Sequence, residues 1–110
     1  MKIGTNANTS IPCYVVIKSK GYIISAKIYT SKNKDTALEY HFIAKKEDNT
    51  FVGDSLEEVL GLITMWEIRG QNNDDWRADH DEIIDYDKIF NDAAFFDEDG
   101  NPINEEDIEI

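Results

Sequence analysis

The densest group of ionisable side chains lies between Asp74 and Asp87, in the segment DDWRADHDEIIDYD. Its carboxylates surround Trp76 and Tyr86, and aromatic side chains ringed by acids are typical of a binding hot spot for a basic partner. The residues that we predict to contact such a partner are Asp74, Asp75, Trp76, Asp79, Asp81, Glu82, Asp85, Tyr86 and Asp87. The alternative is a solvated acidic face in which Trp76 packs inward to close the core.

Other side chains that could do chemistry lack the spacing that a catalytic or metal site needs. Cys13, His41 and His80 are the candidate nucleophile and ligands, but they form no CxxC or HExxH pattern. Cys13 stands in an apolar segment, where a thiol usually packs inertly. The chain has no phosphate-binding loop and no dinucleotide fingerprint. We therefore predict a protein that is not an enzyme and that holds no cofactor and no metal.

The segment DEDGN, residues 97–101, partly resembles a calcium loop. With Gly100 as the sixth position, Asp97 and Asp99 fall at positions three and five, and Glu106 falls at position twelve. Position one would then be Phe95, which cannot ligate an ion, whereas a calcium loop needs a carboxylate there. We predict a plain turn at this segment.

Charge limits the classes of partner. The chain has 11 basic and 23 acidic residues, a net charge of -12, so it repels nucleic acid and anionic membrane surfaces. Residues 1–50 carry +4 and residues 51–110 carry -16, which suggests an interaction surface in the second half. A single cysteine excludes an intrachain disulfide, and no segment suggests a secretory signal or a membrane span. We expect a cytoplasmic protein.

A strong helix is predicted over residues 55–69, between the two halves. Capping signals precede it, and apolar residues recur along it at helical spacing. Gly61 is expected to allow close approach of another backbone, and Gly70 to form a left-handed C-cap. Residues that widen the apolar stripe beyond a normal surface helix are Leu62, Met65 and Ile68. The helix is expected to lie across a sheet as core; the alternative adds that Met65 or Trp66 reaches a partner.

The first half predicts an antiparallel meander, because its links are too short for parallel crossovers. The expected strands are 13–18, 22–30, 37–46 and a short one at 50–52, with a hairpin loop at 19–21. Residues 82–94 show helical spacing, with a strand at 83–84 before a shorter helix as the alternative; an acidic tail or edge strand follows at 102–110. The predicted fold is α+β, a single domain over residues 1–110: a meander of three to four strands covered by one main helix, with a second short helix and an acidic C-terminal segment.

The segment LGLITMWEIRGQNNDDW, residues 60–76, with strands before it and acids after it, resembles small acidic immunity proteins of bacterial toxin systems. The resemblance implies tight binding to a contact-dependent or secreted toxin domain, often a basic nuclease, with its active site or substrate groove blocked. It transfers no functional residue to a position in this chain.

Three functions follow as hypotheses. The first is a non-catalytic inhibitor whose acids stand in for phosphates in the groove of a cationic toxin. The second is a nucleic-acid mimic of the phage type, or another acidic interaction module, which would need its acids in regularly spaced rows. The third is an enzyme or small-ligand domain, which a deep pocket holding His41 and two converging carboxylates would favour.

Overall fold

The computed structural model describes residues 1–30, 37–70 and 76–104. The chain divides into two compact units, Met1–Trp76 and Arg77–Ile110. Their strands and helices make an α+β protein, as the sequence predicts. The single domain over residues 1–110 stays a prediction.

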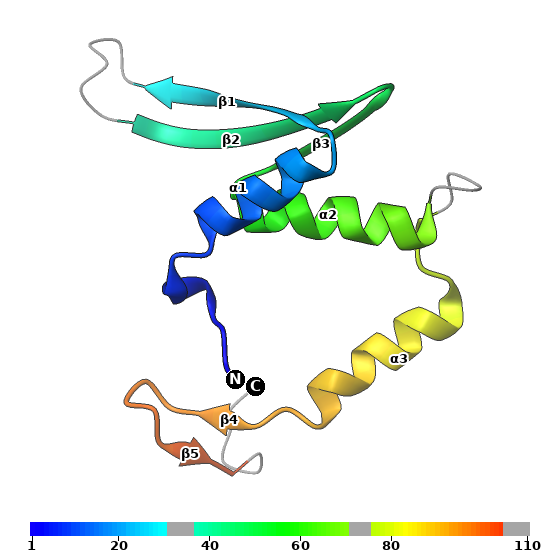
Figure 1. Ribbon diagram of the computed structural model, residues 1–110. Coiled ribbons are helices and arrows are strands. Elements are labelled where there is room, and N and C mark those ends of the chain that lie inside the picture. The colour runs from blue at the N-terminus through cyan, green and yellow to red at the C-terminus, as the bar shows by residue number, and fades with distance from the viewer. Residues whose placement is uncertain (31–36, 71–75, 105–110) are drawn as a thin grey trace. The chain divides into compact units, whose positions relative to one another are not determined.

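The first unit is built on a three-stranded antiparallel sheet in the order β1-β2-β3 (Figure 1). Its strands are β1 (Ile23–Thr30), β2 (Ala37–Lys46) and β3 (Asn49–Gly53). Ile24 pairs with Ala44, and Ala44 pairs with Phe51, so these three apolar side chains share one face of the sheet. The predicted meander is confirmed; the turn expected at 31–36 lies outside the described residues.

The segment 13–18, predicted as a buried strand, belongs instead to a helix, α1 (Ser10–Ser19), so that prediction was wrong. β-branched and aromatic residues favour strands only weakly, and packing decides the outcome. Cys13 and Ile17 are four residues apart, on one side of the helix, and both pack in the core. Pro12 falls in the first turn, where its missing N–H would have no helical partner in any case.

The hairpin loop predicted at 19–21 was wrong, because this segment links the helix α1 to the strand β1. Gly21 has the positive φ expected of it, 92°, and its N–H donates to the Lys18 carbonyl at 2.9 Å. The chain therefore reverses here from a helix into a strand, with the left-handed conformation that glycine adopts at no steric cost.

The predicted central helix is confirmed as α2 (Leu56–Arg69). The Ser55 hydroxyl accepts from the Glu58 N–H at 3.1 Å, and the Glu58 carboxylate accepts from the Asp54 N–H at 3.0 Å. These bonds satisfy N–H groups at the start of the helix that have no partner within it.

Two expectations about the glycines of α2 were wrong. Gly70 has φ -108°, which is not left-handed; its role is steric, since a Cβ there would lie 2.6 Å from Trp66 Cδ1. Among the residues that the structure describes, nothing lies within 4 Å of a Cβ built on Gly61, so no other described backbone approaches it.

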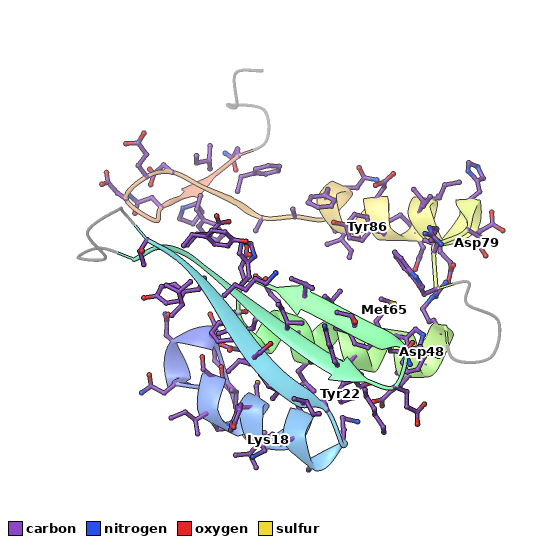
Figure 2. All side chains as sticks on the ribbon, turned by 90° about the horizontal axis from the view of Figure 1, so that it is seen from above. Lys18, Tyr22, Asp48, Met65, Asp79 and Tyr86 are labelled. Carbon is purple, nitrogen blue, oxygen red and sulfur yellow. The ribbon has the colours of Figure 1, made fainter. Side chains whose placement is uncertain are left out.

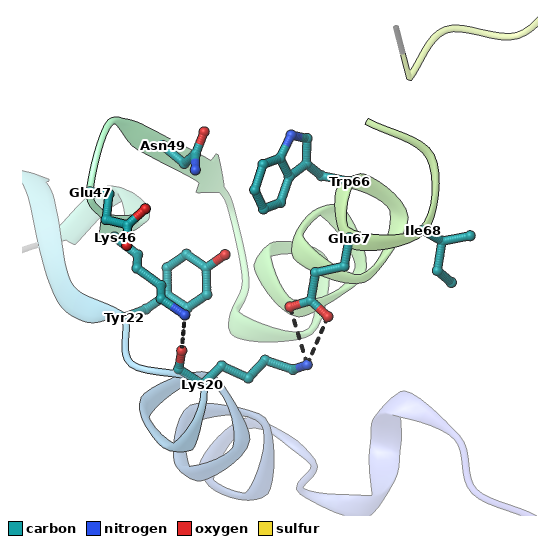
Figure 3. Close-up of a pocket in the computed structure, with 8 residues that line it drawn as sticks. All are labelled: Lys20, Tyr22, Lys46, Glu47, Asn49, Trp66, Glu67 and Ile68. Carbon is teal, nitrogen blue, oxygen red and sulfur yellow. Dashed lines mark hydrogen bonds and ion pairs between the residues drawn. The ribbon is translucent and has the colours of Figure 1, made fainter. Parts of the chain in front are cut away.

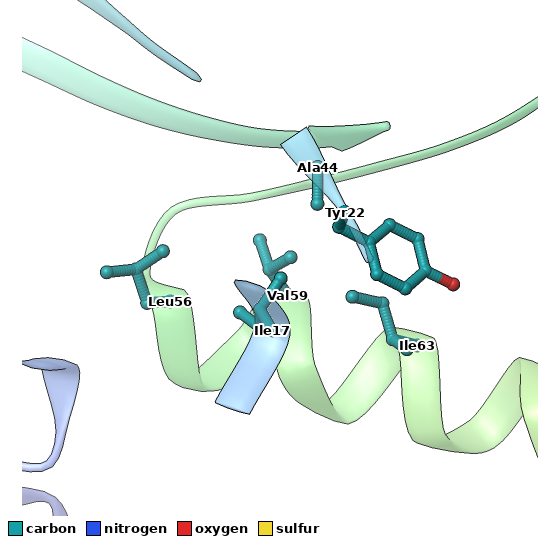
Figure 4. Close-up of a cluster of buried hydrophobic side chains, with 6 residues drawn as sticks. All are labelled: Ile17, Tyr22, Ala44, Leu56, Val59 and Ile63. Carbon is teal, nitrogen blue, oxygen red and sulfur yellow. The ribbon is translucent and has the colours of Figure 1, made fainter. Parts of the chain in front are cut away.

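The core of the first unit lies between the sheet and the two helices α1 and α2, which cover one face (Figures 1 and 4). The buried residues of this cluster are Ile17, Tyr22, Ala44, Leu56, Val59 and Ile63. Each large side chain buried in this way stabilises the fold by about 1.5–3 kcal/mol. The main helix therefore shares its covering role with α1, because the segment expected as the first strand is helical.

Polar bonds also join α1 to α2. The hydroxyls of Ser10 and Thr9 donate to the Glu57 carboxylate at 2.9 and 3.2 Å. The Ser10 hydrogen bond is the chief cause of a Glu57 pKa below its ordinary value. At the other end of the helix pair, Lys20 Nζ lies 3.0 Å from Glu67 Oε2.

The second unit contains α3 (His80–Asn91) and a small hairpin of β4 (Phe95–Phe96) and β5 (Pro102–Ile103). The predicted helix exists, but it begins earlier than the expected 82–94 because Asp79 caps it, and it ends at Asn91. Ile83 and Ile84 are helical, so the alternative strand there was wrong. The predicted turn at 97–101 is confirmed, with the Asp97 carboxylate accepting from two backbone N–H groups. Residues 105–110 of the expected tail lie outside the described residues.

Candidate binding surfaces

The nine residues predicted to contact a partner fall in three places. Asp74 and Asp75 lie outside the described residues, and Trp76 ends the first unit. The other six belong to the second unit and lie on α3 or at its N-cap. Those six are Asp79, Asp81, Glu82, Asp85, Tyr86 and Asp87.

Two of these acids form the start of the helix. Asp79 Oδ1 accepts from the Glu82 N–H at 2.8 Å, and Glu82 Oε1 accepts from the Asp79 N–H at 2.9 Å. This capping box satisfies two backbone donors and places negative charge at the positive end of the helix dipole. Sequence reasoning assigned both residues to a partner, whereas their spacing is also a capping signature.

An apolar stripe runs along α3, and we call Ile83, Tyr86 and Phe90 the α3 stripe. Their spacing of three and seven residues places them on one side of the helix. Tyr86 and Phe90 are 59% and 60% exposed, and their rings meet edge to face with centroids 5.5 Å apart. Figure 2 shows the Tyr86 side chain projecting from the helix. The ring contact orders two aromatic side chains that are mostly exposed among the described residues.

Carboxylates border the α3 stripe. Asp87 follows Ile83 by four residues, and Glu82 precedes Tyr86 by four, so helical geometry places one acid on each flank. Beside the stripe is a surface hollow of about 490 Å³. Its lining residues are Glu82, Asp85, Tyr86, Lys88, Ile89 and Asp92. Because carboxylates outnumber the single ammonium, this hollow suits a cationic group better than an anionic one.

The charge of the chain is concentrated in the second unit. Residues 77–110 contain 13 Asp or Glu against Arg77 and Lys88, a net charge of -11, and residues 1–76 carry the remaining -1. None of the described residues from 77 to 104 is buried, and only Ile103 is half-buried. This unit therefore combines strong negative charge with uncovered apolar side chains.

Trp76 is 43% exposed and forms one wall of a hollow in the first unit. We call this hollow of about 200 Å³ the strand-edge hollow; it is lined by Thr50, Phe51, Leu62, Met65, Trp66 and Trp76. The Trp76 carbonyl accepts from Arg69 Nε at 3.1 Å, which fixes the backbone that carries the ring. The Trp76 side chain is thus partly exposed and packs at the surface of the first unit.

A larger hollow of about 590 Å³ lies at the other side of Trp66 (Figure 3). Its cations are engaged: Lys20 pairs with Glu67, and Lys46 Nζ donates to the Lys20 carbonyl at 2.7 Å while lying over the Tyr22 ring. The Lys20 ammonium is thus paired with a carboxylate, whereas Lys46 donates to a neutral carbonyl.

His41 of β2 lies between the carboxylates of Glu39 and Asp54. Such a group would favour an enzyme if it lay in a deep pocket. Its Nε2 is 2.9 Å from Glu39 Oε1, and its Nδ1 is 3.4 Å from Asp54 Oδ1. The Tyr29 ring meets it edge to face. None of the four hollows described in this molecule is lined by His41.

Cys13 and the possible metal ligands are the remaining candidates for chemistry. Burial, and secondarily the charge of Glu57, raises the pKa of the Cys13 thiol, which disfavours the reactive thiolate. Within residues 1–30, 37–70 and 76–104, no three His, Cys, Asp or Glu side chains are grouped to hold a metal ion. Glu106, the expected twelfth position of a calcium loop, lies outside those ranges. Among the same residues, no helix has the length and apolar character to cross a bilayer.

The strand-edge hollow was not predicted from the sequence, although the width of the α2 apolar stripe indicated surplus apolar side chains. The apolar stripe of α2 is too wide for the six-residue core, and the surplus side chains Leu62 and Met65 line the hollow. Comparison with protein families, characterised proteins and solved structures finds no match to this chain.

Proposed function

We infer that this protein is a non-catalytic inhibitor that binds and blocks a cationic protein. The partner that we propose is a basic toxin domain such as a nuclease. The observation that carries this proposal is the α3 stripe, an exposed aromatic and apolar surface bordered by carboxylates in a unit of net charge -11. Uncovered aromatic side chains of this kind supply binding energy when a partner buries them.

The two kinds of side chain have separate roles in this proposal. The acids attract a cationic partner and accelerate association, an effect that salt screens. Tyr86 and Phe90 then leave water, and each large apolar side chain that becomes buried contributes about 1.5–3 kcal/mol. The acids thus select a cationic partner, and burial of the stripe slows the dissociation of that partner.

The arrangement of acids favours this partner over the alternative of a nucleic-acid mimic. Asp81 and Asp85 are four residues apart and form one row on α3, but Ile89 occupies the next place in that row. Four residues of helix rise about 6 Å, so the row ends after a single interval. A surface that alternates acids with large apolar groups fits a protein better than it imitates a phosphate backbone.

The test expresses any cationic nuclease that is encoded beside this gene and measures its inhibition. The full-length protein should bind that nuclease and block its activity. The double variant Tyr86→Ala/Phe90→Ala should bind about 10- to 100-fold more weakly, as the loss of aromatic anchors predicts. The matched control is Ile84→Ala, an exposed residue outside the α3 stripe, which should bind within about threefold of the unmodified protein.

Two results would overturn the proposal. One is the absence of binding to any cationic nuclease encoded beside this gene. The other is equal loss of affinity in the double variant and in Ile84→Ala, because the stripe would then have no special role.

A further inference from the structure

The strand β3 lies at the edge of its sheet. It pairs with β2 on one side, and no described segment pairs with its other side. An edge strand presents backbone N–H and C=O groups that can pair with an added strand. At about 3.3 Å per residue, the five residues of β3 give an edge of roughly 16 Å, enough for a short extended segment.

The strand-edge hollow opens beside this strand. Thr50 and Phe51 of β3 form one wall, and Leu62 and Met65 of α2 form part of the other. Its volume of about 200 Å³ is smaller than the 300–1,000 Å³ of a typical small-molecule site. The hollow therefore suits one side chain of a peptide better than a free ligand.

The walls of the hollow are held in place. Trp66 packs on Phe51 with ring centroids 5.7 Å apart, and its other edge contacts Gly70, where even a Cβ would clash. Arg69 holds the backbone of Trp76. A rigid pocket loses little side-chain entropy on binding, which favours affinity.

Acids stand at both ends of the β3 edge. Glu47 and Asp48 form the turn before the strand, and Asp54 follows it. Asp48 also lines a second hollow of about 300 Å³ that shares Trp66 and Trp76 with the strand-edge hollow. Of the basic side chains nearby, Lys46 donates to the Lys20 carbonyl, and Lys45 pairs with Thr50 of β3 in the sheet register. The ends of the edge therefore complement basic side chains.

We propose that β3 and the strand-edge hollow bind an extended basic peptide segment as a fourth strand of the sheet. The segment pairs its backbone with β3, places one apolar side chain between Trp66, Trp76 and Met65, and directs basic side chains towards Asp48 and Asp54. This is strand addition, in which backbone bonds give affinity and a pocket selects a side chain. The site lies wholly in the first unit and does not depend on the proposed function.

The test uses the full-length, isotope-labelled protein and four capped heptapeptides. The probe is Lys-Thr-Val-Leu-Val-Thr-Lys, followed by versions with the central Leu replaced by Ser, with both Lys replaced by Glu, and with alternate backbone nitrogens methylated. The probe should shift the amide signals of β3 and the indole signals of Trp66 and Trp76. Each altered peptide should bind at least about tenfold more weakly, the change that 1.4 kcal/mol produces.

A matched pair of variants tests the pocket directly. Met65→Gln makes the hollow polar without removing a good helix former and should weaken probe binding at least about fivefold. Ile68→Gln, on the same helix but outside the strand-edge hollow, should change it less than about twofold.

Other patterns of binding would overturn the proposal. Shifts confined to α3 would show that the peptide binds only the second unit, through charge, and not β3. Equal affinity of the methylated peptide would exclude strand pairing, and equal effects of Met65→Gln and Ile68→Gln would exclude the pocket. A free apolar compound such as indole that fills the hollow, while the probe leaves β3 unshifted, would make it a small-ligand site instead.

Discussion

In the first unit, Val59 and Ile63 of α2 are fully buried, whereas in the second unit Tyr86 and Phe90 of α3 are mostly exposed. Both helices begin with a capping side chain and carry an apolar stripe. All six buried core residues belong to the first unit, and almost all of the net charge belongs to the second. Similar local signals thus form both helices, but only α2 uses its stripe to hold a core.

Core truncation should give the largest difference between the units. Ile63→Ala leaves a cavity against α1 and the sheet, and we expect a loss of about 2–5 kcal/mol in the free energy of unfolding. Ile89→Ala on α3 removes a side chain that is 63% exposed, so its effect should stay within about 0.5 kcal/mol. Chemical denaturation of both variants measures this, and similar losses would show that α3 is part of a buried core.

The two glycines of α2 should respond in opposite directions. Gly70→Ala drives a Cβ into the Trp66 ring, and such overpacking costs about 1–3 kcal/mol. Gly61→Ala adds a methyl in open space within a helix and should stabilise by about 0.5–1 kcal/mol. Thermal unfolding followed by tryptophan fluorescence measures both effects; stabilisation by Gly70→Ala would refute the steric role given to that glycine.

Removing the helix caps should also affect the two units differently. Ser55→Ala removes the cap of α2 and should lower the free energy of global unfolding by about 1 kcal/mol. Asp79→Ala removes the cap of α3 and should reduce the helicity of residues 80–91 while leaving unfolding of the first unit unchanged. Hydrogen exchange resolved by residue distinguishes the two, and a global loss in Asp79→Ala would contradict the separation.

The smallest expected effect is a pH dependence within the first unit. The Ser10 hydroxyl lowers the pKa of Glu57 below its ordinary 4.5, so this bond stabilises the fold above that pH and is lost as the pH falls through the lowered pKa. Glu57→Gln should therefore flatten the dependence of stability on pH below about 4.5. Denaturation at several pH values measures it, and an unchanged profile in Glu57→Gln would exclude the contribution.

The sequence predicted the parts of this fold whose local signals agree with their packing. The strand at 37–46, the α2 caps and the turn at 97–101 are examples, and the concentration of acids beyond the midpoint was visible by counting. Segment 13–18 was assigned wrongly because a short apolar run does not distinguish a buried strand from a buried helix. The four-residue spacing of Cys13 and Ile17 and the position of Pro12 were hints of a helix.

The candidate sites were predicted less completely. The sequence grouped Trp76 with the acids that follow it, but Trp76 lines a hollow whose other walls come from β3 and α2. Such a site joins residues that are distant in sequence, and periodicity along one helix reveals only its own share, here Leu62 and Met65. The capping roles of Asp79 and Glu82 were hidden because capping and binding favour the same residue types.

The central claim is that acids beside the α3 stripe attract a cationic protein through their position and not only through bulk charge. The most direct measurement compares two variants of equal net charge, Asp85→Asn/Asp87→Asn on α3 and Glu98→Gln/Asp99→Asn in the hairpin turn. Their association rates with a cationic nuclease that this protein inhibits would be followed at low and high salt. The α3 variant should associate several-fold more slowly at low salt, with the difference lost at high salt. Equal slowing of both variants, or of neither, would contradict the account.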